Sequence, residues 1–203
     1  MAIAVPGFLL VAGSRYFGER ARERSDARAM IFQLLAVTVN TVEAARPAPA
    51  DRSLRANLML IDREQNALRM AYHTTGYSPG ELKLPWHLGQ GCAGEAWQRR
   101  ATIIAPEGSE LPVSVKDADK TDRPWNMTSE QLRMTALTIS SVLSVPVFLP
   151  GGPLVGVLTL DDSKRLDESR LGTPEVQQAA EAVASDIGAL LKKAGTDIPE
   201  SIE

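Results

Sequence analysis

Residues 141–161 read SVLSVPVFLPGGPLVGVLTLD and carry the clearest strand signals of the sequence. The stretch contains two apolar runs, Ser141–Leu149 and Leu154–Asp161, separated by the four residues Pro-Gly-Gly-Pro. Short apolar runs rich in β-branched residues are typical of buried strands, and proline and glycine are typical of the turns between them. The stretch therefore predicts two strands joined by a turn at residues 150–153.

A helix is predicted after this pair of strands. Thr173 is suited to cap its N-terminus and Pro174 to occupy its first position. Lys192 and Lys193 fall in the expected last turn, where basic side chains interact favourably with the helix dipole. The apolar stripe of this helix repeats at helical spacing and consists of Val176, Ala180, Val183, Ile187, Leu190 and Leu191.

The other end of the chain predicts a second long helix, from about Gly18 to Ala45. Pro47 and Pro49 then end the helical pattern. Apolar positions again recur at helical spacing, at Ala27, Ile31, Leu34, Leu35, Thr38 and Val42.

An antiparallel hairpin is predicted between the two helices. Leu54–Asp62 and Ala67–Thr74 both alternate in side-chain type, and a short polar segment connects them. In the second strand the alternation places Leu68, Met70 and Tyr72 on one face of the sheet.

Short elements and one long segment follow the hairpin. Cys92–Arg99 predicts a short helix and Ala101–Ala105 a brief strand. Residues 106–127 are charged and irregular, and a segment of that length in a compact domain is typical of a lid. Residues 128–131, Thr-Ser-Glu-Gln, have the form of a capping box, so a helix is predicted from there to about Ser140.

Together these elements predict an α+β domain. Its central sheet would have about five or six mostly antiparallel strands, with the N- and C-terminal helices packed on one face and the lid on the other. The domain is expected to span residues 18–195, with an apolar segment at residues 1–17 and a disordered tail at residues 196–203.

Four segments of this pattern, in this order, resemble the GAF domain family. The PAS fold is related, but the pair SVPV…GVLTL before a terminal helix is more similar to GAF domains. The resemblance covers about residues 30–191. The segments that carry it are Leu58–Asp62 with the strand after it, Leu88–Trp97 (LGQGCAGEAW) with Thr102–Ile104 after it, Ser140–Val147, and Leu154–Leu160.

The resemblance implies a module that senses a small molecule or dimerises, because family members bind cyclic nucleotides, tetrapyrroles, haem or small metabolites between the sheet and the lid. The leading expectation is a sensory module that binds a small molecule and signals through its helices or a partner protein. The alternative is a ligand-free scaffold for dimerisation or protein docking. No residue names the ligand or a cofactor, because function depends on the site and not on the fold. The residues expected around a ligand are Met59, Met70, Tyr72, Trp86, Cys92, Ala93 and Trp125.

Enzymatic activity is not expected, and no catalytic residue is predicted. One branch of the GAF family reduces free methionine sulfoxide, which requires a thiolate and then a second thiol to resolve the sulfenic acid. Cys92 is the only cysteine in the sequence. It stands near a helix start, where a thiolate is favoured, but its small neighbours Gly91 and Ala93 are typical of a packing position.

The sequence contains no motif that identifies a cofactor or metal site. His73 and His87 are each able to ligate haem, but a lone histidine carries no spacing signal. The nucleotide-binding signature of the family is missing. Residues 117–122 contain three aspartates, but Asp122 and Thr128 stand where an EF-hand calcium loop needs glycine and glutamate. No metal site is therefore predicted.

Charge and cysteine content bear on partners and compartment. The net charge of −3 is too small to indicate a nucleic-acid partner, and a single cysteine fits the reducing cytoplasm. Met1–Gly13 is apolar and is followed by arginines, which resembles the cytoplasmic end of a membrane anchor. Membrane contact through residues 1–17 is thus one interpretation, and a buried N-terminal segment is the other. The two flanking helices are expected to pair two copies into a homodimer.

Overall fold

The structure is a computed structural model that describes residues 6–46, 53–105, 126–135 and 139–195. For residues 6–20 it describes the backbone without the side chains. Residues 106–125 of the predicted lid and the predicted tail at residues 196–203 lie outside the described residues.

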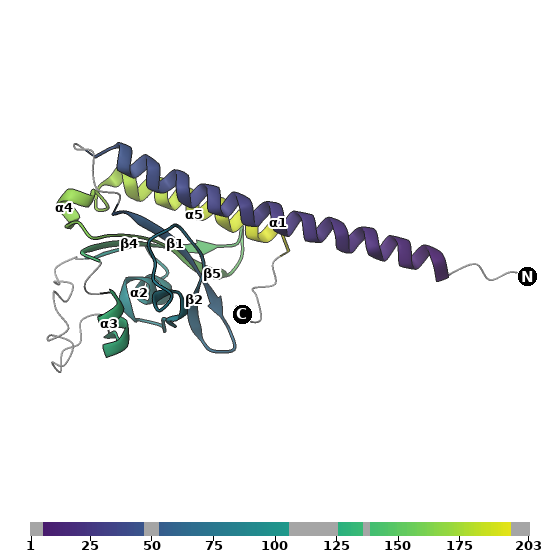
Figure 1. The fold of residues 1–203 in the computed structure, drawn as a ribbon, viewed down its shortest axis with the longest axis horizontal. Helices are drawn as coiled ribbons and strands as arrows, with labels where there is room; N and C mark the ends of the chain where they lie inside the picture. Colours follow the sequence, from purple (N-terminus) through teal and green to yellow (C-terminus); the bar gives the residue numbers. More distant parts are fainter. Residues whose placement is uncertain (1–5, 47–52, 106–125, 136–138, 196–203) are drawn as a thin grey trace, which may run out of the picture.

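The centre of the molecule is a five-stranded sheet with the spatial order β2-β1-β5-β4-β3 (Figure 1). Every neighbouring pair of strands is antiparallel. The predicted α+β architecture around a mostly antiparallel sheet is therefore confirmed. The strands are β1 (Arg55–Asp62), β2 (Ala67–His73), β3 (Ile103–Ala105), β4 (Ser141–Phe148) and β5 (Leu154–Asp162).

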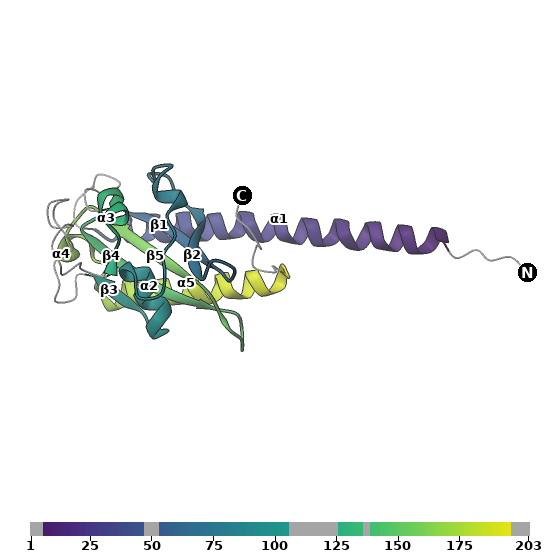
Figure 2. The ribbon, with the colours of Figure 1, turned by 90° about the horizontal axis from the view of Figure 1, so that it is seen from below.

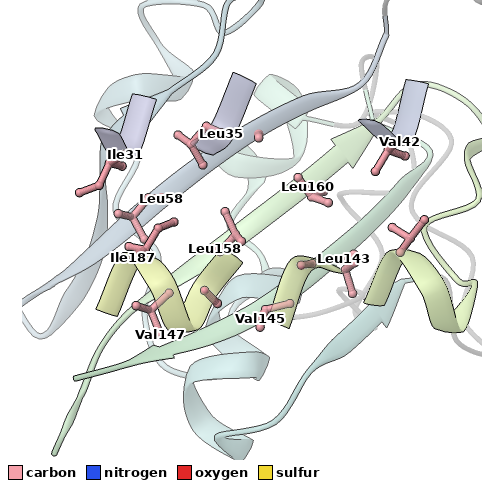
Figure 3. Packing of buried hydrophobic residues seen from close by; sticks show 14 of the residues in the cluster. Ile31, Leu35, Val42, Leu58, Leu143, Val145, Val147, Leu158, Leu160 and Ile187 are labelled. Atoms are coloured by element: carbon pink, nitrogen blue, oxygen red, sulfur yellow. The ribbon is translucent and has the colours of Figure 1, made fainter. Parts of the chain in front are cut away.

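The stretch at residues 141–161 forms the two strands predicted for it, β4 and β5. Strand β5 is the middle strand of the sheet, with β1 on one side and β4 on the other, and all of its residues are buried. Leu143 pairs with Leu160 and Val145 pairs with Leu158 across the two strands. These four side chains point toward the helices that cover this face of the sheet (Figure 3).

Two long helices form that covering layer. Helices α1 (Pro6–Ala44) and α5 (Pro174–Lys193) lie side by side over the sheet (Figures 1 and 2). Ile31 and Leu35 of α1 and Ile187 of α5 are fully buried with Leu58 and Leu158 of the sheet (Figure 3). Full burial of each such side chain contributes about 1.5–3 kcal/mol, and a second buried cluster, which includes Met59, Met70 and Trp86, lies on the opposite face of the sheet.

Helix α5 begins as the sequence predicts. The Thr173 hydroxyl oxygen accepts a hydrogen bond from the Val176 N–H at 3.5 Å, and Pro174 occupies the first helical position. The cap satisfies one of the N–H groups that have no partner within the helix.

Helix α1 begins earlier than predicted. The expected start was Gly18, whereas the helix begins at Pro6 and continues through Gly13 and Gly18. Proline is compatible with the first turn of a helix, and an interior glycine costs only about 1 kcal/mol, so neither residue type ends it. The N-terminal part of α1 extends beyond the sheet (Figure 1). None of the described helices is sufficiently long and apolar to cross a membrane.

Short elements occupy the opposite face of the sheet. They are η1 (Glu81–Lys83), α2 (Gly91–Arg99) and α3 (Ser129–Thr135). The predicted capping box starts α3, since the Thr128 N–H donates to Gln131 Oε1 at 2.7 Å and the Gln131 N–H donates to Thr128 Oγ1 at 3.1 Å. The predicted end of this helix near Ser140 falls after α3, beyond residues 136–138, which are not described.

Buried charges fasten the C-terminal end of α1 to the sheet. Arg46 pairs with Asp162 of β5 and with Glu43, whose Oε1 lies 3.1 Å from Arg46 Nη1. Ser53 Oγ donates to Asp162 Oδ1 at 2.7 Å. The short helix α4 (Leu166–Ser169) also contributes, through a contact between the Ser169 carbonyl oxygen and Arg46.

Candidate functional site

A cavity of about 70 Å³ lies on the face of the sheet that carries the short elements. A single water needs roughly 10–15 Å³ by the same measure, so the cavity has room for several waters or a small organic molecule. Its apolar wall is formed by side chains from the sheet, from α2 and from the segments around η1 and α3. The wall includes Met59, Met70, Leu84, Trp86, Met127 and Val142.

Five of the seven residues predicted around a ligand line this cavity: Met59, Met70, Trp86, Cys92 and Ala93. Each is at most 9 % exposed. Gly91 makes this arrangement feasible, because its φ of +61° favours glycine and an added Cβ would lie 2.6 Å from the Trp86 ring. That these five residues hold a ligand remains a prediction.

Tyr72 does not line the cavity, and the prediction for it is wrong. Its ring packs edge-on against Phe32 of α1, with ring centroids 5.4 Å apart, so it lies on the helix-covered face. The cause is an irregularity in the β1–β2 pairing, where Leu58 pairs with Tyr72 but Met59 pairs with Met70. The extra residue, Ala71, reverses the alternation after Met70.

The remaining candidates are Trp125 and the two histidines. Trp125 lies outside the described residues. The two histidines are not among the residues that line the cavity. His73 Nδ1 is 2.8 Å from the Thr74 carbonyl oxygen, and exposed His87 has its Nδ1 3.1 Å from the Asn66 carbonyl oxygen.

One end of the cavity is polar, which was not predicted. We define the polar wall as Asn57, Tyr77, Glu81, Thr159 and Asp161, all of which line the cavity. The register of β1 and β5 brings the strand residues of the wall together. Asn57 of β1 pairs with Thr159 of β5, and Arg55, two residues earlier in β1, pairs with Asp161. Cross-strand partners on one face have adjacent side chains, so the sheet builds the part of the wall formed by Asn57, Thr159 and Asp161.

Hydrogen bonds connect the polar wall to Arg55. The Tyr77 hydroxyl donates to Asp161 Oδ2 at 2.6 Å and accepts from Asn57 Nδ2 at 2.9 Å. Arg55 Nε donates to Asp161 Oδ1 at 2.6 Å, and Arg55 Nη1 lies 3.2 Å from Glu81 Oε1. The guanidinium also stacks over the Tyr77 ring at 4.1 Å from its centroid. One cation thus holds two carboxylates and a phenol in place.

Burial dominates the ionisation of this group. Burial raises the pKa of Asp161 above its ordinary value, although Arg55 and the Tyr77 hydrogen bond act to lower it. Burial, together with the charge of Asp161, raises the pKa of Tyr77 well above its ordinary value, so the phenol keeps its proton and donates it. For Arg55, burial lowers the pKa, but Asp161 and the other neighbours outweigh it and the net shift is upward. The Asp161 carboxylate is therefore incompletely compensated by its neighbours.

Two buried polar atoms near this wall have no hydrogen-bond partner among the described residues: Asn57 Oδ1 and Arg55 Nη2. Asn57 is 1 % exposed and lines the cavity, whereas Arg55 is not among its lining residues. A buried polar atom without a partner costs about 1–3 kcal/mol. An acceptor that lacks a donor is therefore present in a side chain of the cavity wall.

Comparison with known proteins identifies the fold. No family model and no curated protein matches the sequence. Among solved structures, the GAF domain region of a protein from Geobacter sulfurreducens PCA is similar at a TM-score of 0.58 and 16 % identity, covering 86 % of this chain and 98 % of that one. The GAF domain from Acinetobacter phosphoenolpyruvate-protein phosphotransferase is similar at a TM-score of 0.51 and 15 % identity, covering 89 % and 95 %.

The chain has the GAF-domain fold. The type II free methionine-R-sulfoxide reductase from Thermoplasma acidophilum shares it, with a TM-score of 0.54, 14 % identity, and coverage of 84 % of this chain and 96 % of that one. Identities this low establish the fold and not the activity. The chemistry of this chain has to be argued from its own cavity.

Cys92 lies in the wall of the cavity and is the side chain that a reductase activity of this chain would need. Its Sγ donates weakly to the Ile103 carbonyl oxygen at 3.4 Å. Burial raises the pKa of the Cys92 thiol from 9.0 to about 12, despite the lowering effect of a hydrogen bond with Ser144. The helix-start position does not produce a thiolate here, because burial outweighs the helix dipole.

Within the part of the chain that the structure describes, no three His, Cys, Asp or Glu side chains come together to hold a metal ion. The polar wall of the cavity contains two carboxylates, Glu81 and Asp161, and both already pair with Arg55. The groups of the polar wall therefore interact through ion pairs and hydrogen bonds.

The polar wall had a signal in the sequence that was not used. In Leu54–Asp62 the residues Arg55 and Asn57 alternate with apolar ones, and in Leu154–Asp161 Thr159 and Asp161 do the same. Polar residues on the second face of strands whose first face is apolar indicate a solvated surface or a polar site. The packing of η1, α2 and α3 over that face shows that these polar residues line a cavity and do not form a solvated surface.

Proposed function

We propose that this chain is a sensory module in which the cavity binds a small molecule and the helices α1 and α5 pass the binding event to a partner. The observation that carries the proposal is the cavity itself, which stays open between Met59, Met70 and Trp86 and ends in the polar wall. In a ligand-free scaffold these large side chains would be expected to fill the space, since protein interiors are close-packed. A largely apolar recess with a few convergent polar groups is typical of a ligand site.

The sheet supplies a route from the cavity to the helices. Asp161 and Asp162 are consecutive residues of β5, and neighbouring residues of a strand point to opposite faces. Asp161 lines the cavity, while Asp162 pairs with Arg46 at the end of α1. A ligand that changes the contacts of Asp161 therefore acts one residue away from the ion pair that fastens α1.

The experiment compares the natural chain with a variant whose cavity is filled. Ala93→Leu adds three carbons at a position that lines the cavity and is 5 % exposed. Ala182→Leu makes the same change on the exposed surface of α5 and serves as the matched control. Each protein is expressed in cells, purified without denaturants and weighed by native mass spectrometry. It is then titrated with a metabolite collection and followed by tryptophan fluorescence, since Trp86 lines the cavity.

A bound mass or a fluorescence change that is kept in the control and lost in Ala93→Leu supports the proposal. Identical results for the natural chain and for Ala93→Leu, including the absence of any binding, contradict it. The scaffold alternative would then be preferred.

Reduction of methionine sulfoxide is not part of the proposal. The reductase from Thermoplasma acidophilum shares the fold, but a reductase thiol has to ionise to attack the sulfoxide, and the raised pKa of Cys92 keeps it protonated near neutral pH. A coupled assay with free methionine sulfoxide and a dithiol reductant checks this point. Turnover that disappears in Cys92→Ser would show that Cys92 is catalytic.

We also propose that two copies pair along α1. Met30 and Val37 are 49 % and 60 % exposed and lie seven residues apart, so they share one side of the helix. Analytical ultracentrifugation should show a dimer for the natural chain and a monomer for the double variant Met30→Glu/Val37→Glu. An unchanged sedimentation coefficient in that variant would argue against this interface.

A further inference from the structure

Recognition of the ligand depends on the polar wall, and the charges there are mainly negative. Of the cavity-lining side chains, Glu81 and Asp161 are acidic, and none is lysine, arginine or histidine within the described part of the chain. Arg55 stands behind the wall and pairs with both carboxylates. One positive charge against two carboxylates leaves a net negative site, which disfavours a carboxylate or phosphate ligand.

The unpartnered acceptor in the wall points to the same class of ligand. Tyr77 donates its only hydroxyl hydrogen to Asp161, so the atom of Asn57 that contacts Tyr77 has to be the Nδ2 donor. This leaves Asn57 Oδ1 as the atom without a partner, in a side chain that is 99 % buried. An acceptor is satisfied by an N–H or O–H donor and not by another acceptor.

The remaining wall defines the rest of the molecule. Met59 and Met70 are flexible and polarisable, and Trp86 adds a flat apolar surface, so this part accepts an apolar body without specific polar groups. The cavity volume of about 70 Å³ restricts that body to a few carbon atoms.

We propose that the cavity binds a small primary amine in its ammonium form, with the ammonium group at Asn57 and Asp161 and a short apolar chain against Met59, Met70 and Trp86. This inference rests on the proposed function, because it names the ligand class of the same cavity. An ammonium group carries three donors, which suits a wall that presents carboxylate, amide and hydroxyl oxygens. It also supplies the second cation that the two carboxylates lack. Burial raises the pKa of Asp161 even beside Arg55, and a second cation would lower it.

The test uses three probes that share a four-carbon chain and differ in the head group: n-butylamine, n-butanol and n-butyrate. Each is titrated into the ¹⁵N-labelled full chain near neutral pH and followed by NMR, which detects millimolar binding and reports the Asn57 side-chain amide directly. Butylamine is expected to bind best and to shift that amide signal, butanol to bind more weakly, and butyrate not to bind.

Two isosteric variants separate the head-group contact from general electrostatics. Asp161→Asn removes a carboxylate from the wall, and Asp167→Asn removes one from an exposed side chain. Asp161→Asn should weaken butylamine binding about tenfold or more and leave butanol unchanged, because a charge-assisted hydrogen bond is lost. Asp167→Asn should change neither. If Asp161→Asn does not give a folded spectrum, Glu81→Gln replaces it. Glu81→Gln should likewise weaken butylamine binding and leave butanol binding unchanged.

The outcomes distinguish this inference from the proposed function. If butyrate or butanol binds at least as tightly as butylamine, or if Asp161→Asn and Glu81→Gln both leave butylamine binding unchanged, the amine class is wrong while a binding cavity remains. If none of the three probes shifts the cavity signals, the amine inference also fails. The native mass spectrometry of Ala93→Leu then decides separately whether the cavity binds anything.

Discussion

Replacing Arg55 with methionine tests the account of the polar wall most directly. Arg55 Nε lies 2.6 Å from Asp161 Oδ1, and its Nη1 lies 3.2 Å from Glu81 Oε1 and donates to the Gly76 carbonyl oxygen at 2.8 Å. Its side chain is 10 % exposed. Methionine keeps an unbranched chain that still packs on Tyr77 but removes the cation that pairs with both carboxylates.

The expected loss is large at neutral pH. Removing one partner of a buried ion pair costs about 3–5 kcal/mol, because the other charge is left buried without compensation. Domains of this kind have unfolding free energies of about 5–15 kcal/mol, so Arg55→Met should stay folded but lose a substantial part of that value.

The loss should depend on pH, in a direction that the pKa of Asp161 determines. Burial raises this pKa in the folded protein, and Arg55 partly opposes the shift, so its removal raises the pKa of Asp161 further. The folded variant then holds the Asp161 proton more tightly than the unfolded chain does. Protonated Asp161 therefore contributes its full stabilisation of the variant below the ordinary aspartate pKa, about 3.9. This contribution is lost as the pH rises through the raised pKa of Asp161 in the folded variant.

Urea unfolding followed by circular dichroism near pH 4.5 and near pH 7.5 measures the difference. Arg55→Met should be much closer to the natural chain at the lower pH. Arg165→Met, in which the side chain is 81 % exposed, should differ from the natural chain by no more than about 0.5 kcal/mol at both values. Arg55→Met/Asp161→Asn should recover part of the loss near neutral pH. An equal loss at both pH values, or a loss below about 1 kcal/mol near pH 7.5, would refute the reasoning.

Two further predictions concern the helix layer and the thiol. A Cβ on Gly188 of α5 would lie 2.0 Å from the Phe148 carbonyl oxygen. Gly188→Ala should therefore destabilise the fold by about 1–3 kcal/mol through overpacking, whereas exposed Ser185→Ala should stabilise it slightly. A higher melting temperature for Gly188→Ala than for the natural chain would contradict the close approach of α5 to β4. Cys92, whose pKa is raised from 9.0 to about 12, has roughly a thousandfold smaller thiolate fraction than an ordinary thiol near pH 8. A disulfide reagent should thus label it far more slowly in the native protein than in urea, and similar rates would contradict the burial.

Much of the fold was predictable because its signals are local. The two strands at 141–161, the Thr173 cap and the Thr128–Gln131 capping box all depend on residues within a few positions of one another, and the structure contains each of them. The apolar stripes of α1 and α5 likewise follow from helical spacing, and they meet over the sheet as expected (Figure 3). The early start of α1 was missed because glycine is a weak signal for a helix end.

The candidate site was predictable only on its apolar side. Met59 and Met70 belong to predicted strands and line the cavity, whereas Tyr72 was misplaced because the irregular pairing of β1 with β2 reverses its direction. A bulge depends on how two strands align, and no pattern within one strand reports it.

Spacing along the chain is enough to predict the long helices and the strands and, except at Tyr72, the side of each that is apolar. The tertiary structure alone brings Asn57, Tyr77 and Asp161 into one wall with Arg55 behind it, since Arg55 and Asp161 are 106 residues apart and meet through the β1–β5 register. The raised pKa values of Asp161 and Cys92 have the same origin. Burial is a property of the assembled layers, so a residue's chemistry here depends on what packs against it.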